Sequence, residues 1–161
     1  MIHVTVLCVG KVKETFYRQA LEEYAKRLDG RYCKFKVVEV ADEPTPDHSS
    51  EAETNAILEK EGQRLLSKIP ESASVITLEI KGKSLTSEEM AAWIGKQASS
   101  GESHLCFIIG GSLGLSPEVT KKASLHLSFS AMTFPHQLMR VILSEQIYRS
   151  FRILANEPYH K

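Results

Sequence analysis

The amino-acid sequence predicts an α/β protein with a mostly parallel sheet and helices on both faces. Short apolar segments rich in β-branched residues alternate with helical patterns along the whole chain. No linker, internal repeat or low-complexity tract divides the 161 residues, a length typical of one domain. Strand–helix alternation of this kind forms βαβ units, whose strands run parallel and whose helices cover the sheet. We therefore expect one α/β domain that spans residues 1–161.

Five segments are predicted to be strands because each is apolar and is bounded by turn residues. The first, HVTVLCV, ends at Gly10, and the second, KFKVVEV, runs into the turn-rich loop DEPTPDHSS. SVITLEI, HLCFIIGG and LHLSFS follow as the third, fourth and fifth. In chain order the predicted strands cover residues 3–9, 34–40, 74–80, 104–111 and 125–130.

Helical patterns fill the segments between these strands. In the first, residues 13–28, ring and leucine side chains recur at helical spacing at Tyr17, Leu21, Tyr24 and Leu28. Capping boxes, in which a Ser or Thr is followed three residues later by Glu, open the next two helices at Ser50 and Thr86. These helices are expected to end near Leu66 and Ala98. SPEVTKKA is a short helix capped by Ser116, with proline at its first position.

The last helix follows the stretch FSAMTFPHQLMR. Phe134 precedes a proline and is therefore extended, and Pro135 suits a first helical turn. Apolar side chains gather on one arc of this helix, and Val141 and Tyr148 lie outside that arc. On the polar side, Glu145 precedes Arg149 in the favourable i,i+4 order. Two interpretations stay open: a core helix with a surface ion pair, or a helix that also supplies a homodimer contact. The apolar arc covers about half the helix at 100° per residue and consists of Leu138, Met139, Ile142, Leu143, Ile147 and Leu154.

The charge balance excludes some classes of protein. Lysine and arginine total 20, as do aspartate and glutamate, so the net charge is zero, whereas a stand-alone nucleic-acid-binding protein usually has a basic excess. Local basic patches remain possible, as at Lys11 and Lys13. No stretch approaches the roughly 20 apolar residues that cross a bilayer, and MIHVTVLCVGK lacks the features of a signal peptide. We expect a cytoplasmic protein that does not bind membranes.

Cysteine and histidine spacing predicts neither a disulfide framework nor a metal site. The three cysteines form no CxxC pair, and Cys8 and Cys106 lie in apolar runs that would raise a thiol pKa. The six histidines form no HxH, HxxxH or HExxH pattern. Reduced, buried thiols and no metal are therefore expected.

Three strand ends are candidate ligand sites, because open parallel sheets bind ligands beyond the carboxyl ends of their strands. IIGGSLG has glycines that let backbone approach a ligand, but it lacks the GxGxxG pattern and the P-loop lysine, so it also fits a plain turn. LEIKGK fits a solvated turn at Gly82, or a ligand contact through Leu78 and its backbone. The third is SFSAMTFP. The tail, NEPYHK, is either solvated or able to stack on a base, move a proton and bind phosphate.

Read together, four blocks resemble one family: TLEIKGK, FIIGGSLGLS, LSFSAMTFPHQLMRVILSEQIYRSFRI and NEPYHK. They are similar to the small SPOUT-class (α/β-knot) methyltransferases that modify N3 of a pseudouridine in bacterial 23S ribosomal RNA. The resemblance runs from the N-terminal VGK to the final YHK, and TFPHQLMRV and PYHK are its most specific parts. It implies a homodimer and a C-terminal trefoil knot over residues 74–155 approximately, a rare exception to unknotted topology. It also implies 23S rRNA as the substrate, and the lack of a separate RNA-binding domain suggests that a large structured substrate, such as the assembled ribosome, supplies the recognition surface.

The resemblance further implies that S-adenosylmethionine (S-adenosyl-L-methionine) lies in the knot as methyl donor, without a metal. The residues that would bind it are Leu78, Gly110, Phe129, Ser130, Ala131, Met132, Thr133 and Phe134. The catalytic candidates are His136, Arg140, Tyr159 and His160. An arginine would stabilise a developing imide anion, and a histidine or the tyrosine would act as base or orient the pseudouridine. His136 and Arg140 lie one helical turn apart and are expected to face the same site.

Two other functions fit parts of the sequence. A Rossmann-like enzyme that binds a nucleotide or phosphate through GGSLG would bind ATP or NAD rather than S-adenosylmethionine. A non-catalytic ribosome-associated factor would incorporate no methyl groups. The enzyme is favoured, because an adaptor has no need of three ligand-type strand ends and a Tyr-His tail.

Overall fold

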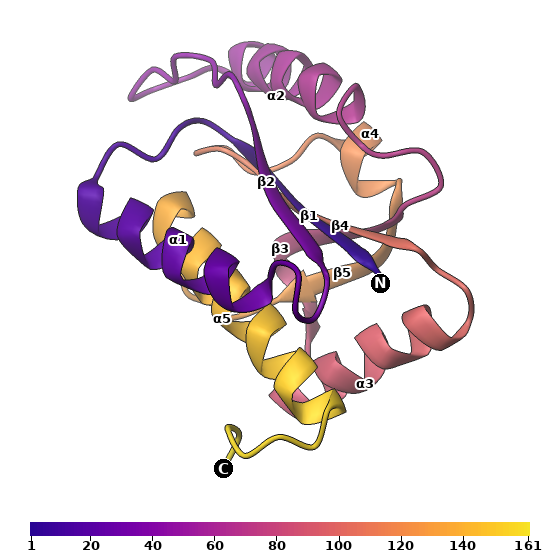
Figure 1. Cartoon of the computed structure of the whole chain (residues 1–161). Helices are drawn as coiled ribbons and strands as arrows, with labels where there is room; N and C mark the ends of the chain where they lie inside the picture. The colour runs from indigo at the N-terminus through magenta and orange to yellow at the C-terminus, as the bar shows by residue number, and fades with distance from the viewer.

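Strands and helices alternate from end to end in the computed structural model, which describes residues 1–161 (Figure 1). The strands are β1 (His3–Val9), β2 (Lys34–Val40), β3 (Ser74–Ser84), β4 (His104–Ile109) and β5 (Ala123–Ser128). The helices are α1 (Thr15–Leu28), α2 (Glu51–Leu66), α3 (Ser87–Ser99), α4 (Pro117–Thr120) and α5 (His136–Leu154). The predicted α/β class and every predicted element are confirmed.

All five strands form one parallel sheet with the order β2-β1-β4-β3-β5. β1 pairs with β2 on one side and β4 on the other, and every residue from Val4 to Val9 is buried. This explains the continuous apolar sequence of β1, because a parallel strand covered on both faces has no solvent side. Since the strands run parallel, their carboxyl ends all lie at one edge of the sheet.

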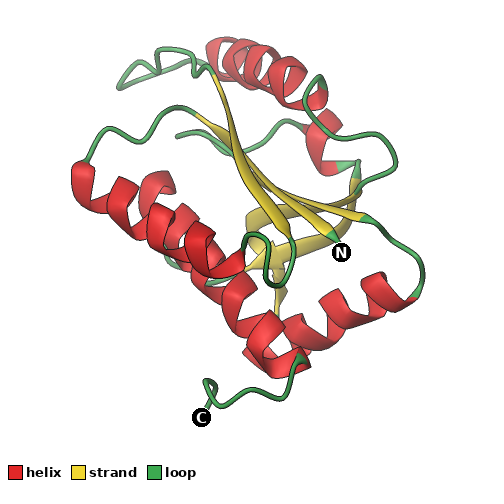
Figure 2. Ribbon diagram, in the orientation of Figure 1, coloured by secondary structure: helices red, strands yellow, loops and turns green.

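Helices cover both faces of the sheet (Figures 1 and 2). α1, α3 and α5 lie on one face, where α5 packs against both of the others, and α2 and α4 lie on the opposite face. Each face has its own apolar core. The larger, under α1, α3 and α5, includes Val6, Phe107 and Ile147, and the smaller, under α2 and α4, includes Leu7 and Ile108.

Side-chain caps begin three of the helices as the sequence predicts. Ser50 Oγ accepts from the Glu53 amide at 3.1 Å, and Glu53 in turn accepts from the Ser50 amide at 3.4 Å. At α3 only the first half of the box forms, because Thr86 Oγ1 accepts from the Glu89 amide at 3.1 Å without a reciprocal bond. Ser116 caps α4, with proline as the first helical residue.

The buried face of α5 differs from the predicted apolar arc. Tyr148, expected outside the arc, is only 5% exposed, and Leu154, expected inside it, is 43% exposed. The aromatic rings of Tyr24, Tyr32 and Tyr159 surround Tyr148, with ring centroids 5.0 to 6.3 Å away, so contacts with other segments, which a helical wheel does not contain, bury this side of the helix. The buried residues of α5 are Arg140, Leu143, Ser144, Ile147, Tyr148, Ser150 and Phe151.

Three predicted boundaries shift near the edge strand β5. β3 continues through KGK to Ser84, so this segment is not a turn. A Cβ at Gly82 would lie 2.8 Å from the His126 carbonyl oxygen, and glycine therefore permits the close approach of β3 to β5. α4 is shorter than expected because Ala123 already pairs with Val75 of β3, and β5 ends at Ser128 rather than Ser130.

The three cysteines are free and buried, and burial raises the pKa of each thiol to about 12. This confirms the prediction of buried thiols and leaves them unreactive. None of the helices is long and apolar enough to span a membrane.

Candidate cofactor site

A cavity of about 680 Å³ lies at the edge of the sheet where the strands end. Its walls are the end of β3 from Leu78 to Lys81, the loop after β4 from Gly110 to Leu115, and the loop before α5 from Phe129 to Pro135. Pockets for small molecules occupy about 300–1,000 Å³ and are mostly apolar with a few polar groups. The three strand ends that compete in the sequence therefore form one site.

Most of the expected cofactor-binding residues line this cavity. They are Leu78, Gly110, Phe129, Ser130, Met132, Thr133 and Phe134. Ala131 lies in the same loop but is exposed and is not part of the wall. Met132 is 74% exposed although it lines the cavity, so its side chain stands at the rim.

The glycine loop is shaped by close backbone contacts. A Cβ at Gly110 would lie 2.4 Å from the Gly114 carbonyl oxygen, so only glycine lets the loop fold onto itself there. Gly114 has a φ of +90°, in the left-handed region that glycine adopts without strain. Its amide donates to the Gly111 carbonyl at 3.1 Å. The two interpretations of IIGGSLG are therefore compatible, because the segment is a tight turn and also forms part of the cavity wall.

Serine side chains tie the loop before α5 to β3. Ser128 Oγ donates to the Ile80 carbonyl at 2.8 Å and lies 3.2 Å from the Ser130 carbonyl oxygen. Ser130 Oγ accepts from the Met132 amide at 2.9 Å. These bonds hold two walls of the cavity in register through Ser128, which is itself buried.

Glu79 is a polar residue of the wall that the sequence does not single out. Its Oε2 accepts from Thr77 Oγ1 at 2.6 Å and also contacts His126 Nδ1. The carboxylate is thereby fixed by two neighbours on β3 and β5. Its sequence signal is weak, because an acidic residue one position after Leu78 in LEIKGK also suits an exposed strand end.

His136, the first residue of α5, lines the cavity. Its Nδ1 is buried without a hydrogen-bond partner, and its Cε1 lies 3.6 Å from the position of a Cβ at Gly10. Burial, followed by the Arg140 guanidinium, holds the pKa of His136 below its ordinary value, against smaller opposite effects of Asp42 and Glu14. The imidazole is therefore neutral at neutral pH.

Arg140, unlike His136, does not line the cavity. Its side chain is 1% exposed and forms no part of the cavity wall. Nη1 donates to Glu39 Oε2 at 2.5 Å, and Nη2 donates to the carbonyls of Gly10 at 2.7 Å and Val9 at 3.2 Å. The expectation that His136 and Arg140 face the same site is corrected here: one turn apart on α5, they turn to the cavity and to the protein interior respectively.

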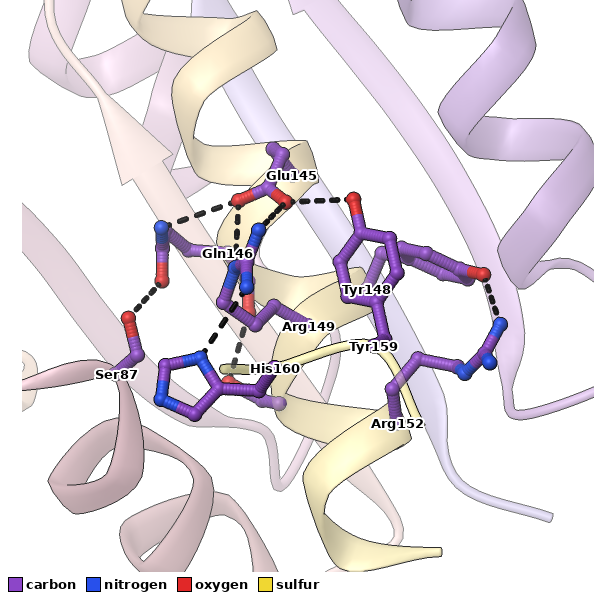
Figure 3. A network of polar contacts seen from close by, with 9 residues as sticks. Ser87, Glu145, Gln146, Tyr148, Arg149, Arg152, Tyr159 and His160 are labelled. Carbon is purple, nitrogen blue, oxygen red and sulfur yellow. Dashed lines mark hydrogen bonds and ion pairs between the residues drawn. The ribbon is translucent and has the colours of Figure 1, made fainter. Parts of the chain in front are cut away.

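Tyr159 and His160 lie at the other end of α5 (Figure 3). Tyr159 donates to Glu145 Oε1 at 2.9 Å, and His160 lies between Glu88 at 2.5 Å and Arg149 at 3.2 Å. Burial and the Glu145 hydrogen bond raise the pKa of Tyr159, so its phenol is protonated. Their contacts on α5, Glu145 and Arg149, follow His136 by nine and 13 residues, which at roughly 1.5 Å per residue is about 14 Å and about 20 Å along the helix. Within one chain the four catalytic candidates thus fall into separate places.

Several apolar residues of the cavity wall escape sequence analysis because they look like ordinary core residues. Those that line the cavity are Ile80, Ile109, Leu115, Leu127 and Met139. Gly111 and Gly114, in contrast, belong to the glycine-rich loop that the sequence marks. No cluster of three or more His, Cys, Asp or Glu side chains has the arrangement of a metal site.

Comparison with known proteins identifies relatives along the whole chain. A family model described as "Predicted SPOUT methyltransferase" matches residues 2–160. A Bifidobacterium adolescentis protein named Ribosomal RNA large subunit methyltransferase H is 58% identical over 158 residues, which cover 98% of this chain and 99% of the relative. Proteins of the same name from Bifidobacterium animalis subsp. lactis and Clostridium beijerinckii are 56% and 54% identical over 160 residues, 99% of this chain and 100% of each relative.

A solved structure shares the fold. It is that of a probable methylase family protein from Haemophilus influenzae Rd KW20, with a TM-score of 0.54 and 11% sequence identity. The alignment covers 99% of this chain and 71% of that chain. At this identity the likeness concerns the fold alone.

Proposed function

This chain belongs to the SPOUT methyltransferase family, and from that membership we propose that it methylates N3 of a pseudouridine in 23S ribosomal RNA with S-adenosylmethionine as methyl donor. The observation that carries the proposal is the cavity of about 680 Å³, which the C-terminal half of β3 and the loops after β4 and β5 enclose. It occurs in a chain that matches relatives named Ribosomal RNA large subunit methyltransferase H over 98% or more of its length.

The cavity suits S-adenosylmethionine in size and chemistry. Leu78, Phe129 and Phe134 supply apolar walls, the glycine loop brings backbone close, and Glu79 adds to the wall a negative charge that favours a cationic ligand. When bound, S-adenosylmethionine supplies a methyl group activated by a sulfonium. The residues that would hold it are Leu78, Gly110, Phe129, Ser130, Ala131, Met132, Thr133 and Phe134, with Ala131 acting through its backbone.

His136 is the proposed proton acceptor. N3 of a pseudouridine carries a proton and is a poor nucleophile, so methylation requires its removal as the N–C bond forms. The neutral imidazole that burial and Arg140 maintain has a lone pair for this proton. The position of His136 on the cavity wall supports the assignment, because a general base must lie within hydrogen-bond reach of its substrate.

Arg140 is assigned a positioning function in place of direct anion stabilisation. Its burial leaves no path to a substrate carbonyl, whereas its contacts with Glu39 and Gly10 fix the backbone beside His136. A developing imide anion would then be stabilised by other donors.

The tail residues Tyr159 and His160 are proposed to act at the cavity of a partner subunit in a homodimer. Two observations support this. Tyr159 and His160 contact Glu145 and Arg149, about 14 Å and about 20 Å along α5 from His136 of their own chain. Apolar side chains also stay exposed on α1 and α5, with Phe16 63% and Leu154 43% exposed. An isologous dimer contact buries the same patch on both subunits, so it would cover these residues in each of them.

The assembled ribosome in the cytoplasm is the proposed substrate. The 20 Lys and Arg residues are balanced by 20 Asp and Glu residues, so the chain has no excess of cations for phosphate contacts and a large structured substrate must supply much of the recognition surface. Lys11 and Lys13 are exposed in the loop after β1, next to Gly10 and thus to His136. They are candidate cations for a phosphate beside the cavity, together with Lys81, which is exposed on the cavity wall itself.

The single domain of residues 1–161 and the trefoil knot over residues 74–155 approximately also stay proposals. The strand order supports the knot, because the chain leaves β4, passes beyond β3 to form β5, and then returns as α5 to pack on α1 and α3. Such a path brings the last helix close to the C-terminal half of β3 and the loop after β4.

Ligand binding and methyl transfer test the function against its rivals. Calorimetry of the purified chain should show binding of S-adenosylmethionine and S-adenosylhomocysteine, and none of ATP or NAD. Labelled methyl groups should be incorporated into ribosomes from a strain that lacks the enzyme. Binding of ATP or NAD instead would favour the Rossmann-like alternative, and cofactor-independent ribosome binding without incorporation would favour the non-catalytic factor.

A further inference from the structure

Glu61 on α2 is a buried acid that the proposed reaction does not use. The residue is 4% exposed, and its Oε1 is buried without a hydrogen-bond partner. Oε2 accepts from the Glu43 amide at 2.9 Å. Burial raises the pKa of Glu61, against the opposing effect of that amide bond. A buried carboxyl group with one unpaired oxygen is costly to a fold, so its presence points to a requirement at this place.

The carboxyl group of Glu61 lies against the glycine loop of the cavity. A Cβ at Gly111 would lie 3.1 Å from Glu61 Oε1 and 3.2 Å from Val9 Cγ1, tighter than ordinary contacts. Gly111 does not have the positive φ of Gly114. The backbone at Gly111 would therefore accept a side chain, and the obstacle is the space that Glu61 and Val9 fill.

The next residue of α2 supports the far end of the same segment. A Cβ at Gly62 would lie 2.5 Å from Ser116 Oγ, so α2 approaches the cap of α4 as closely as a glycine allows. Glu61 and Gly62 thus contact the two ends of the segment from Gly111 to Ser116. Residues Gly111, Ser112, Gly114 and Leu115 of this segment line the cavity.

We propose that Glu61 is a positioning residue of the cofactor site, whose carboxyl group fills the space beside Gly111 and holds the loop after β4 where it closes the cavity. It acts through the backbone of Gly111 and does not touch the ligand. The inference rests on the proposed function, because the ligand in question is S-adenosylmethionine.

Calorimetry with S-adenosylhomocysteine on the full chain tests this first. E61A should weaken binding by about tenfold, because the loop loses its preorganised position. E61Q keeps the volume and an acceptor for the Glu43 amide, and should stay within about threefold of the wild type. E59A is the matched control, an exposed glutamate on the same helix that should bind as the wild type does. In steady-state assays E61A should raise KM for S-adenosylmethionine more than it lowers kcat.

A reciprocal substitution makes the test specific to the contact. G111A should weaken binding, because its methyl group meets the Glu61 carboxyl group. In E61A/G111A the carboxyl contact is gone and only Val9 still crowds that methyl, so the double variant should bind more tightly than G111A. Residues in contact are non-additive in this way, by about twofold or more. G111A keeps Glu61 and remains informative even where E61A folds poorly.

Binding by E61A equal to the wild type, or strictly additive effects in the double variant, would overturn the proposal. If the wild-type chain binds no S-adenosylhomocysteine, that result would instead contradict the proposed function. In that case amide hydrogen exchange of residues 110–116 decides the role of Glu61 without a ligand. Faster exchange in E61A but not in E61Q or E59A supports it, and equal exchange in all of them refutes it.

Discussion

Arg140 and Glu39 form an ion pair that joins the second turn of α5 to the end of β2, with 2.5 Å between Nη1 and Oε2. The arginine side chain is 1% exposed and the glutamate 36%, so the pair reaches from the interior to the surface. Two backbone carbonyls at the end of β1, of Val9 and Gly10, complete the contacts of the guanidinium. The pair therefore fixes the backbone next to His136.

R140M should destabilise the fold strongly. It leaves two backbone carbonyls without their donor and Glu39 with only the Val12 amide at 3.2 Å, and the loss costs about 3 kcal/mol, the low end for a buried pair because Glu39 is partly exposed. For a chain of this size the melting temperature should fall by about 6–12 °C. R31M is the control, because Arg31 pairs with Glu157 at 3.4 Å on the surface and its loss should cost below about 0.5 kcal/mol. Equal melting temperatures for R140M and the wild type would contradict the structural role.

H136A should slow single-turnover methyl transfer by about 10²–10⁴-fold, the usual contribution of a general base. Cofactor binding should change much less. An unchanged transfer rate in the double variant H136A/H160A would exclude both imidazoles as the proton acceptor.

The pH dependence of transfer should follow the lowered pKa of His136. The neutral imidazole is the active form, so activity should be full above the ordinary histidine pKa and fall only as pH drops below it, through the lowered value. In a folded Arg140 variant that lacks the positive charge, the pKa of His136 should rise. The acid limb should then move to higher pH, and a limb that does not move would argue against His136 as the base.

Mixed dimers test whether the tail acts at the partner's cavity. One subunit carries H136A, and the other lacks residues 159–161. Each homodimer should be inactive, but the heterodimer has one cavity with an intact His136 and a tail from its partner. Random mixing should therefore restore about one quarter of wild-type activity, because about half the dimers are mixed and each has one working site. No restoration would show that the tail acts in its own subunit.

Ribosome binding should weaken with salt, with a modest slope of about 0.7–0.9 per phosphate contact on a log–log plot. K11E and K13E should each reduce this slope by about one and lower the affinity. K68E is the control, an exposed lysine after α2, at the edge of the sheet opposite the cavity. A salt slope that is the same in K11E, K13E and the wild type would show that Lys11 and Lys13 do not contact the RNA.

Local patterns predict the elements of this fold well. The capping box at Ser50 and the proline after Ser116 are contacts between residues close in sequence, so their outcome depends little on the rest of the chain. The extension of β3 through Gly82 depends instead on pairing with β5, more than 40 residues later, so the local sequence does not predict it.

The candidate site likewise combines features that local sequence predicts with features that depend on distant segments. The glycine loop and the segment from Phe129 to Phe134 are local, and they converge because parallel strands end at one edge. The burial of Arg140 is not local, since its partner Glu39 lies on β2 and helical spacing shows only a charged residue. Tyr148 is buried by three tyrosines from other segments. Glu61 contacts a loop that the chain reaches 50 residues later.

The most direct test of the proposed function is mass spectrometry of 23S rRNA nucleosides. Ribosomes from cells that lack this protein should contain an unmethylated pseudouridine. Incubation with the purified chain and S-adenosylmethionine should convert it to N3-methylpseudouridine, whereas the H136A chain should not. If the wild-type chain leaves the nucleoside profile unchanged, or methylates a different nucleoside, the account of its substrate is wrong.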